Sequence, residues 1–407
     1  MMKMQPFHPN KKINKIKAED EMNSKIKVMV VFGTRPEAIK MAPLVKELEK
    51  RPEIECCVCV TAQHREMLDM VLNLFNITPA YDFNIMTPKQ TLNLIASKVI
   101  SEMQDACDDF KPDLVLVHGD TTTAATAALA SFYAGAKVGH VEAGLRSFDK
   151  YSPYPEELNR IIISDIADLH FAATKANRIN LNNENIKDNI FVTGNTVIDA
   201  LKYTIKPGYV YKNEEIREAV LEAQKENKRI ILMTAHRREN FGKPFENIFN
   251  AVKRIADEYK DVLFIYPVHP NPRVKDTAER ILSSTPNVLL THPIDTDDMH
   301  NLINDSYLVL TDSGGLQEEA PSLGKPVLVL RRETERPEAV EAGTVKISGV
   351  EEEDIVKDLT TLLCDNEVYE KMAKAVNPYG DGNASKRIAD AIIYKFAGGP
   401  APEEFTV

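Results

Sequence analysis

Short apolar runs rich in β-branched residues alternate along the chain with longer segments whose apolar positions recur at helical spacing. Strands are predicted in the first half at 27–32, 55–61, 114–118, 138–141, 169–172 and 190–192. The second half repeats the rhythm at 229–234, 262–266, 288–290, 307–311, 327–330 and 344–347. Helical patterns separate the strands, among them 36–50, 64–75, 91–110, 245–259 and 350–362. This alternation predicts an α/β chain of two doubly wound domains, each with a parallel sheet of about six strands.

The join between the two predicted domains falls in the polar stretch 199–228. We therefore expect an N-terminal domain over 25–200 and a C-terminal domain over 201–376. The segment 377–397 opens with NPYGDGNAS and then becomes helical, a pattern that fits either domain. Residues 1–24 are polar with five lysines and no apolar run, so we expect a loosely ordered extension rather than a secretory signal. The final GGPAPEEFTV is expected to be frayed.

Charge and cysteine usage narrow the class of protein. The 407 residues carry 50 Lys+Arg and 61 Asp+Glu, a net charge of −11, which argues against nucleic-acid or anionic-membrane partners. The apolar runs are shorter than the roughly 18–20 residues of a membrane helix. An odd number of cysteines without framework spacing predicts a reducing, cytoplasmic setting. On the 55–61 strand Cys57 and Cys59 share one face and Cys56 the other, and we interpret them as buried thiols rather than a metal site.

Ionisable and small polar residues follow nearly every predicted strand. In open parallel sheets ligands bind beyond the carboxyl ends of the strands, so two such rims facing one another would line a cleft. The segments that follow the strands are 33–37, 62–65, 118–123, 142–146, 236–239, 269–271, 312–315 and 331–335.

Three of these segments suit a phosphorylated ligand. Gly33-Thr34-Arg35-Pro36 leads from a strand into a helix, where backbone N–H groups and the helix dipole favour an anion. Ser313-Gly314-Gly315 repeats the arrangement, with glycines that allow close approach to the backbone. His236-Arg237-Arg238 adds positive charge. No GxGxxG follows a strand, and no GxxxxGK[ST] or GxSxG occurs, which disfavours a nicotinamide dehydrogenase, a P-loop NTPase or an α/β-hydrolase.

Four further residues could carry proton chemistry in such a cleft: Asp120, Glu142, Glu156 and His236. Crowded, desolvated carboxyls have pKa values raised towards working pH, as proton transfer to or from carbon requires. Structural interpretations compete with this one. Asp120 could cap the helix that begins at Thr121, Glu156 could complement a helix dipole, and His236 could be a core residue.

Long, ordered motifs then identify a family. The strings VMVVFGTRPEAIKMAPLVKEL, VTAQHREMLD, PDLVLVHGDTTTA, VGHVEAGLRS, YSPYPEELNR, HRRENFG and LTDSGGLQEEAPSLGKPVLVLRRETERPEAV closely resemble the non-hydrolysing UDP-N-acetylglucosamine 2-epimerases from about residue 25 to 396. The resemblance implies a GT-B fold of two Rossmann-like domains, with the last helix crossing back onto the first. It implies reversible conversion of UDP-N-acetylglucosamine to UDP-N-acetylmannosamine for cell-surface glycan precursors, no cofactor or metal, and a homodimer.

The same resemblance assigns roles to individual residues. Proton transfer falls to Asp120, Glu142 and Glu156, without deciding which is base and which is acid, and His236 assists the leaving diphosphate. UDP binding falls to Arg35, Ser313, Gly314, Gly315 and, for the ribose, Glu319. Supporting charges are Lys40 and Arg146.

Some members of the family also bind a second UDP-sugar as an activator. The matching positions here are Gln63, Glu66, Lys89, Arg237 and His269. Glu66 stands where activated members carry glutamine, and a carboxylate there would repel a UDP-sugar. Three other functions share parts of this pattern: a GT-B glycosyltransferase, a hydrolysing epimerase, and a UDP-sugar-binding regulator without catalysis.

Overall fold

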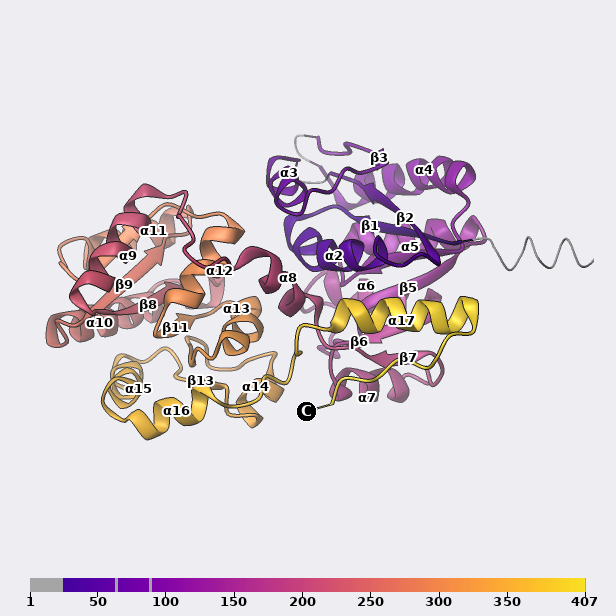
Figure 1. The fold of residues 1–407 in the computed structure, drawn as a ribbon. Coiled ribbons are helices and arrows are strands. Elements are labelled where there is room, and N and C mark those ends of the chain that lie inside the picture. The colour runs from indigo at the N-terminus through magenta and orange to yellow at the C-terminus, as the bar shows by residue number, and fades with distance from the viewer. Residues whose placement is uncertain (1–24, 63–64, 88–89, 407) are drawn as a thin grey trace, which may run out of the picture.

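The computed structural model describes residues 25–62, 65–87 and 90–406. Over these residues the chain forms two α/β domains that lie side by side, each built on one parallel sheet (Figure 1). This arrangement confirms the predicted GT-B fold of two doubly wound domains.

The sheet of the N-terminal domain, sheet A, has the strand order β3-β2-β1-β4-β5-β6-β7 in the described part of the chain. Its strands are β1 (Ile26–Phe32), β2 (Ile54–Val60), β3 (Tyr81–Asp82), β4 (Leu114–His118), β5 (Lys137–Ala143), β6 (Leu169–Ala172) and β7 (Ile190–Val192). The helices of this part are α2 (Arg35–Leu48), α3 (Arg65–Leu74), α4 (Leu92–Phe110), α5 (Thr122–Tyr133), α6 (Glu156–Ile166), α7 (Lys175–Asn183) and α8 (Thr196–Thr204). The strand order reverses between β1 and β4, which makes their carboxyl ends the expected ligand position.

The sheet of the C-terminal domain, sheet B, has the order β10-β9-β8-β11-β12-β13 and reverses between β8 and β11. Its strands are β8 (Arg229–Thr234), β9 (Val262–Pro267), β10 (Val288–Thr291), β11 (Leu308–Thr311), β12 (Val327–Val329) and β13 (Val345–Ile347). The helices of the chain from residue 214 onward, the last of which packs on the N-terminal domain, are α9 (Glu214–Glu226), η1 (Arg238–Asn240), α10 (Lys243–Glu258), α11 (Pro272–Leu282), α12 (Thr296–Asp305), α13 (Gly314–Glu319), η2 (Ala320–Leu323), α14 (Pro337–Glu341), α15 (Glu352–Cys364), α16 (Asn366–Ala373) and α17 (Ala384–Ala397).

The predicted strands lie close to the observed ones, with one exception. Sheet A gains β3, whose Tyr81 and Asp82 pair with Cys59 and Val60 at the edge of the sheet. Two residues are too short to show an alternating pattern, so the sequence did not reveal this strand.

Each sheet has an apolar core on both of its faces. In sheet A, Val30 and Phe32 face one core, and Met29 and Val31 face the other. Cys57 and Cys59 belong to the second core, whereas Cys56 packs against the first, which confirms the predicted division of the thiols. Burial raises the pKa of the Cys57 thiol to about 11 and that of Cys56 to about 12. No metal-binding group of three or more His, Cys, Asp or Glu occurs among the residues described.

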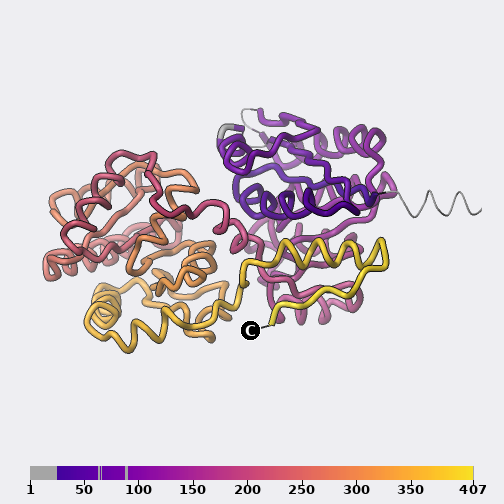
Figure 2. The backbone as a smooth tube through the Cα atoms, viewed as in Figure 1, coloured from indigo at the N-terminus to yellow at the C-terminus, as the bar shows by residue number. Residues whose placement is uncertain are grey.

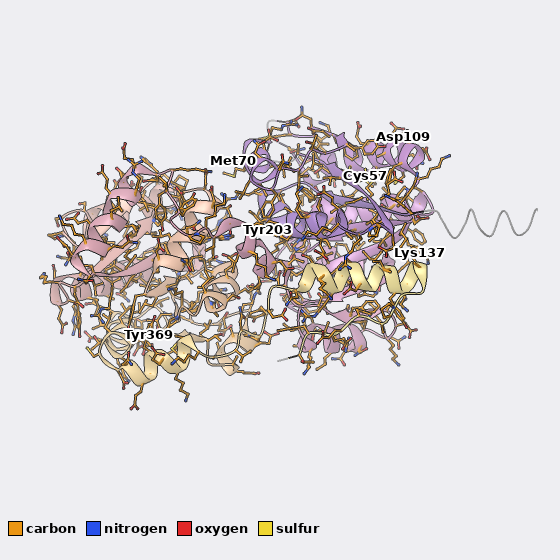
Figure 3. All side chains as sticks on the ribbon, in the orientation of Figure 1. Cys57, Met70, Asp109, Lys137, Tyr203 and Tyr369 are labelled. Carbon is orange, nitrogen blue, oxygen red and sulfur yellow. The ribbon has the colours of Figure 1, made fainter. Side chains whose placement is uncertain are left out.

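The chain crosses between the domains twice, once through α8 and once through the segment that precedes α17 (Figure 2). Tyr203 of α8 lies where the domains meet (Figure 3), and its ring centroid is 5.3 Å from that of Phe75. The helix α17 packs on α2 and α8, and its Ile388 and Ile392 join the core of sheet A. The last helix of the chain therefore completes the N-terminal domain.

The C-terminal tail is not frayed, contrary to the prediction. The backbone N–H of Phe405 donates to the carbonyl of Val192 at 2.8 Å, and the Phe405 side chain is buried. Glu404 pairs with Arg178. The tail thus covers the edge strand β7. Its Pro- and Gly-rich composition does not predict this contact. No helix of the described chain is long and apolar enough to cross a membrane.

Candidate active site

The turn after β1 is closed by an acid of its own helix. Thr34 caps α2, and Glu37 accepts the backbone N–H groups of Gly33 and Thr34 at 3.0 and 2.8 Å. Thr121, at the exit of β4, donates its hydroxyl to the other oxygen of Glu37 at 2.6 Å. The N–H groups of Gly33 and Thr34, which were expected to face an anion, are therefore already bonded by Glu37. Its buried carboxylate instead joins the two strand ends at the switch point of sheet A.

Asp120 follows β4 and is held by a cation from α6. Arg160 donates to Asp120 Oδ2 from Nε at 3.0 Å and from Nη2 at 2.6 Å, and Arg160 also pairs with Glu157 at 2.8 Å. The N-cap of α5 is Thr121, so the alternative that Asp120 caps this helix is wrong. The Asp120 carboxylate, with a side chain 26% exposed, is fixed in place and still reachable.

Glu142 sits on a bulge at the end of β5. The pairing of β5 with β6 shifts register between residues 141 and 143, and Glu142 has φ of +66°, a region that costs free energy for a residue other than glycine. The bulge directs its carboxylate to Lys40 of α2 and to His118, whose Nε2 lies 3.5 Å away. Burial opposes ionisation of Glu142, but Lys40 and His118 outweigh it and hold the pKa of this carboxyl well below its usual range. Asn195 Nδ2 donates to the same carboxylate at 2.9 Å.

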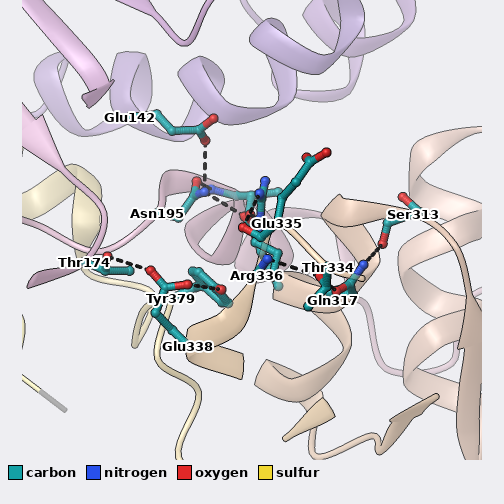
Figure 4. A network of polar contacts seen from close by, with 12 residues as sticks. Glu142, Thr174, Asn195, Ser313, Gln317, Thr334, Glu335, Arg336, Glu338 and Tyr379 are labelled. Carbon is teal, nitrogen blue, oxygen red and sulfur yellow. Dashed lines mark hydrogen bonds and ion pairs between the residues drawn. The ribbon is translucent and has the colours of Figure 1, made fainter. Parts of the chain in front are cut away.

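Contacts continue from Glu142 into the C-terminal domain (Figure 4). The amide of Asn195 also donates to Glu318 of α13 at 2.7 Å, and Glu318 forms an ion pair with Arg336. Nearby, Glu338 accepts hydrogen bonds from Thr174 at 3.3 Å and from Tyr379 at 3.0 Å. The carboxyl end of sheet A is thus joined to that of sheet B by polar contacts.

One buried carboxylate organises the exits of sheet B. Asp312, fully buried after β11, accepts the backbone N–H groups of His236 and Arg237 at 2.8 Å each, and Asn240 Nδ2 at 3.2 Å. His236 Nδ1 lies 3.3 Å from Asp312 Oδ1, and its ring stacks on His269 with centroids 5.6 Å apart. Burial lowers the pKa of His236, while Asp312 opposes that shift. His236 is 39% exposed, so the interpretation as a core histidine is wrong.

Two guanidinium groups face the glycine that begins α13. A Cβ on Gly314 would lie 3.8 Å from Arg336 Nη2 and 3.9 Å from Arg237 Nη2. The same segment continues to Glu319, whose Oε2 is 3.5 Å from His300 Nε2. Exposed glycine backbone beside two forked cations is an arrangement suited to a diphosphate.

The sequence matches the family described as UDP-N-acetylglucosamine 2-epimerase over residues 46–393. The chain belongs to this family. The UDP-N-acetylglucosamine 2-epimerase of Bacillus subtilis is 55% identical over 373 residues, which cover 91% of this chain and 96% of that protein. A Neisseria meningitidis UDP-GlcNAc 2-epimerase solved with UDP-GlcNAc is 50% identical, covers 90% of this chain and 100% of its own, and has a TM-score of 0.81. The Staphylococcus aureus protein MnaA, solved with UDP, is 49% identical, covers 94% and 100%, and has a TM-score of 0.83.

Direct contacts join several members of the residue set that the family resemblance implies. Glu142 and Lys40 are in contact, and His236, Arg237, His269 and Ser313–Gly315 gather around the exits of β8 and β11. Glu156 begins α6, and its Oε2 is buried without a hydrogen-bond partner among the described atoms.

Two further predicted cations have contacts of their own. Arg146, 1% exposed, is held by Glu184 through Nε at 2.7 Å and by Ser164 at 2.9 Å, which makes it a brace between α6 and α7. Arg35 lines a small crevice between the domains with Leu74 and Thr296. Of the predicted activator positions, Gln63 and Lys89, like the extension 1–24, lie outside the described residues, as does the side chain of Glu66.

Sequence reasoning missed four residues of this epimerase site: Arg160, Asn195, Glu318 and Arg336. Glu318 stands directly before Glu319, and Arg336 follows a run of charges, so neither stands out from its neighbours. Arg160 pairs with an acid forty positions away. The motif strings YSPYPEELNR and LTDSGGLQEEAPSLGKPVLVLRRETERPEAV contain Arg160, Glu318 and Arg336, but only the folded structure shows what each one holds.

Proposed function

We propose that this chain interconverts UDP-N-acetylglucosamine and UDP-N-acetylmannosamine by elimination and readdition of UDP, without net hydrolysis. The supporting observation is the meeting of two opposite half-sites. Ion-paired carboxylates stand at the carboxyl ends of β4 and β5, and a glycine turn faced by Arg237 and Arg336 stands at that of β11. Relatives with about half of their residues identical have been solved with UDP and with UDP-GlcNAc.

In the proposed elimination, a carboxylate removes the proton from sugar C2, and the C–H electron pair forms the C1=C2 double bond. The C1–O bond breaks, and its electrons leave with the diphosphate oxygen of UDP, which gives 2-acetamidoglucal. The C2 proton is not acidic, so stabilisation of the departing negative charge supplies much of the rate. His236, Arg237 and Arg336 are placed for that task, with Arg35, Ser313, Gly315 and Glu319 as the remaining UDP contacts.

Readdition runs the same steps from the other face. A carboxylic acid returns a proton to the opposite face of C2, and the retained UDP oxygen attacks C1. The pKa of Glu142 is lowered by Lys40 and His118, contrary to the raised value that the sequence predicted for a crowded carboxyl. The group is therefore ionised and able to accept the proton in one direction, and once protonated it donates readily in the other. Asp120 and Glu156 supply the second face, and the unpartnered Glu156 oxygen offers an acceptor to the sugar.

The proposal is tested by incubation with UDP-N-acetylglucosamine in deuterated water, without added nucleotide cofactor or acceptor. NMR should show deuterium at C2 and UDP-N-acetylmannosamine as product, with little free UDP. Stoichiometric free UDP and free N-acetylmannosamine would make the chain a hydrolysing epimerase. Absence of exchange would leave a glycosyltransferase or a regulator that binds UDP-sugars.

We further propose a homodimer formed through the helices that cover one face of sheet A. The neighbouring helices α4, α5 and α6 expose Ile100, Phe132, Tyr133 and Ile162. An apolar patch of this kind is typical of a protein–protein contact. Light scattering should report a dimer that Ile162→Lys converts to monomer, while Leu221→Lys on α9 of the other domain leaves the mass unchanged. A monomeric native protein would contradict this assembly.

A further inference from the structure

Glu318 is a buried carboxylate that the mechanism above does not use. It lies on α13, four residues after Gly314, and its side chain is 3% exposed. Arg336 donates from Nε to Oε1, and Asn195 donates to Oε2 at 2.7 Å. Its backbone carbonyl accepts the side chain of Asn377 at 2.8 Å. The charge of this group is therefore held by Arg336 and Asn195 at the point where the two domains meet.

The orientation of Asn195 shows that Glu318 and Glu142 are neighbours. Its side-chain oxygen accepts the backbone N–H of Val197 at 3.1 Å, as the cap of α8, so its amide nitrogen must face the acids. That nitrogen donates to Glu142 at 2.9 Å and to Glu318 at 2.7 Å. Two carboxylates that share one amide group repel each other unless cations compensate them.

Cations and neutral groups surround this pair from each packed element. Lys40 of α2 pairs with Glu142, Arg336 pairs with Glu318, and His118 of β4 faces Glu142. From the second crossing, Tyr379 directs its hydroxyl to Glu338, and burial raises the pKa of that tyrosine, which keeps it neutral. Two carboxylates and two permanent cations thus give a cluster without net charge.

A diphosphate would disturb the two acids unequally. Arg336 is the cation that both Glu318 and the Gly314 turn contact, since its Nη2 faces Gly314 while its Nε holds Glu318. An anion at Gly314 would share the charge of Arg336 and add repulsion, whereas Glu142 keeps Lys40 and His118. Burial already raises the pKa of Glu318, and Glu142 adds to that shift against the opposition of Arg336 and Lys40. Added negative charge raises it further.

We propose that Glu318 takes up one proton when the diphosphate of a UDP-sugar occupies the Gly314 turn. Binding of the leaving group would then remove the negative charge that lies next to Glu142. The inference rests on the proposed function, because it assumes that this turn holds the diphosphate. The proton comes from solvent or buffer and forms an O–H bond on the Glu318 carboxylate, and no bond of the substrate breaks in this step.

Calorimetry of UDP-N-acetylglucosamine binding in buffers of different ionisation enthalpy tests the proposal. The sugar-linked diphosphate does not titrate near neutral pH, so the slope of apparent enthalpy against buffer enthalpy counts protons taken up by the protein. We expect a slope approaching about one proton in the native chain and near zero in Glu318→Gln. The matched control is Glu338→Gln, which removes a carboxylate from the same domain contact and should keep the native slope.

The outcomes separate this inference from the proposed function. Failure of the native chain to bind UDP-N-acetylglucosamine would overturn the function itself. Binding with no proton uptake, or uptake unchanged in Glu318→Gln, would overturn the role of Glu318 alone and direct attention to His236. If Glu318→Gln does not fold, His236→Asn decides: proton uptake that persists in His236→Asn supports Glu318, and uptake that is lost in it overturns the role of Glu318. If binding takes up one proton, the affinity for UDP-N-acetylglucosamine should fall by up to about tenfold for each unit that the pH rises. An affinity that does not change with pH contradicts the proposed proton uptake.

Discussion

The carboxyl ends of the two sheets use charge in opposite ways. At sheet A, acids are presented and cations hold them, since Asp120 is fixed by Arg160 and Glu142 by Lys40. At sheet B, cations are presented and an acid holds them, since Asp312 anchors the backbone of His236 and Arg237. The two domains share a topology, but their charges are reversed. The N-terminal domain exposes carboxylates that buried cations hold, and the C-terminal domain exposes cations that a buried carboxylate holds.

This difference explains why each half-site is pre-organised for one task. Buried ion pairs fix the position and charge of a carboxylate before substrate arrives, as proton transfer requires. Asp312 fixes the exit of β8 by accepting backbone N–H groups. The charged side chains of that exit therefore stay available to an anion. Separation of the tasks between domains predicts that variants should affect proton transfer or UDP binding, and seldom both.

The largest expected effect comes from removing an acid of sheet A. Glu142→Gln or Asp120→Asn should lower turnover by about 10²-fold or more, because the proton then lacks its acceptor or donor. UDP affinity should stay within about threefold, since UDP is assigned to sheet B. Steady-state kinetics and calorimetry measure the two quantities, with Glu55→Gln on the surface of β2 as control. Near-native turnover in either variant would remove that residue from the mechanism.

Acid should weaken the N-terminal domain first. Burial lowers the pKa of His140 to about 3 and that of His170 to about 4, and the two pair in register on β5 and β6. Below a pH of about 6.5 the unfolded imidazoles take up protons that the folded ones do not, so stability falls as pH falls. The expected loss is about 1 kcal/mol per histidine between about pH 7 and about pH 5.5.

Urea unfolding at the two pH values measures this loss. His140→Asn should reduce the dependence on pH, whereas His292→Asn in the C-terminal domain, where the side chain is exposed, should leave it unchanged. A denaturation midpoint that does not move with pH in the native chain would contradict the expectation.

Glycines at the two rims should respond differently to an added methyl group. A Cβ on Gly33 would lie 2.0 Å from Thr61 Oγ1, so Gly33→Ala should cost about 2 kcal/mol of stability. Gly314→Ala meets only ordinary contacts with the two arginines and should fold normally, but it should weaken UDP binding severalfold. Thermal denaturation measures the stability of the two variants, and titration measures their UDP affinity. Equal losses of stability and of UDP affinity in both variants would contradict the expected difference between the rims.

A further prediction concerns one cation of sheet B. Arg237→Met should weaken UDP binding by about tenfold, the loss of a charge-assisted hydrogen bond, with little change in stability. Arg332→Met is the matched control, because Arg332 is 73% exposed and pairs with Glu351 at the same end of the sheet. Unchanged UDP affinity in Arg237→Met would remove this arginine from the anion site.

Secondary structure, which depends on residues close together in the chain, could be predicted from the sequence. Contacts between residues far apart in the chain could not. Apolar periodicity located most of the strands and long helices such as the one predicted over 91–110, because burial acts on every second residue of a strand and on every third or fourth residue of a helix. The family resemblance implied a supporting role for Arg146, and the structure adds that Glu184 and Ser164 hold its guanidinium group. The strand–glycine–helix motif predicted exposed N–H groups at the β1 turn, but Glu37 accepts those of Gly33 and Thr34 in a capping box that this motif reasoning overlooked.

The site's remaining residues depend on geometry that no spacing rule encodes. Glu142 reaches Lys40 because a bulge gives it a positive φ, a conformation that the sequence would assign to glycine. Glu318 and Arg336 become partners only when α13 and the approach to α14 fold together.

The two crossings between the domains have a mechanical consequence. The backbone N–H of Asn195 on the first crossing donates to the carbonyl of Tyr379 on the second at 2.7 Å, so the crossings are tied to each other. Two bodies joined by a single tether can tumble about it in any sense, whereas joining at two points leaves rotation about the line between them. Any relative motion of the two domains is therefore restricted to this axis, and the acids of one domain face the cations of the other in nearly the same alignment throughout it.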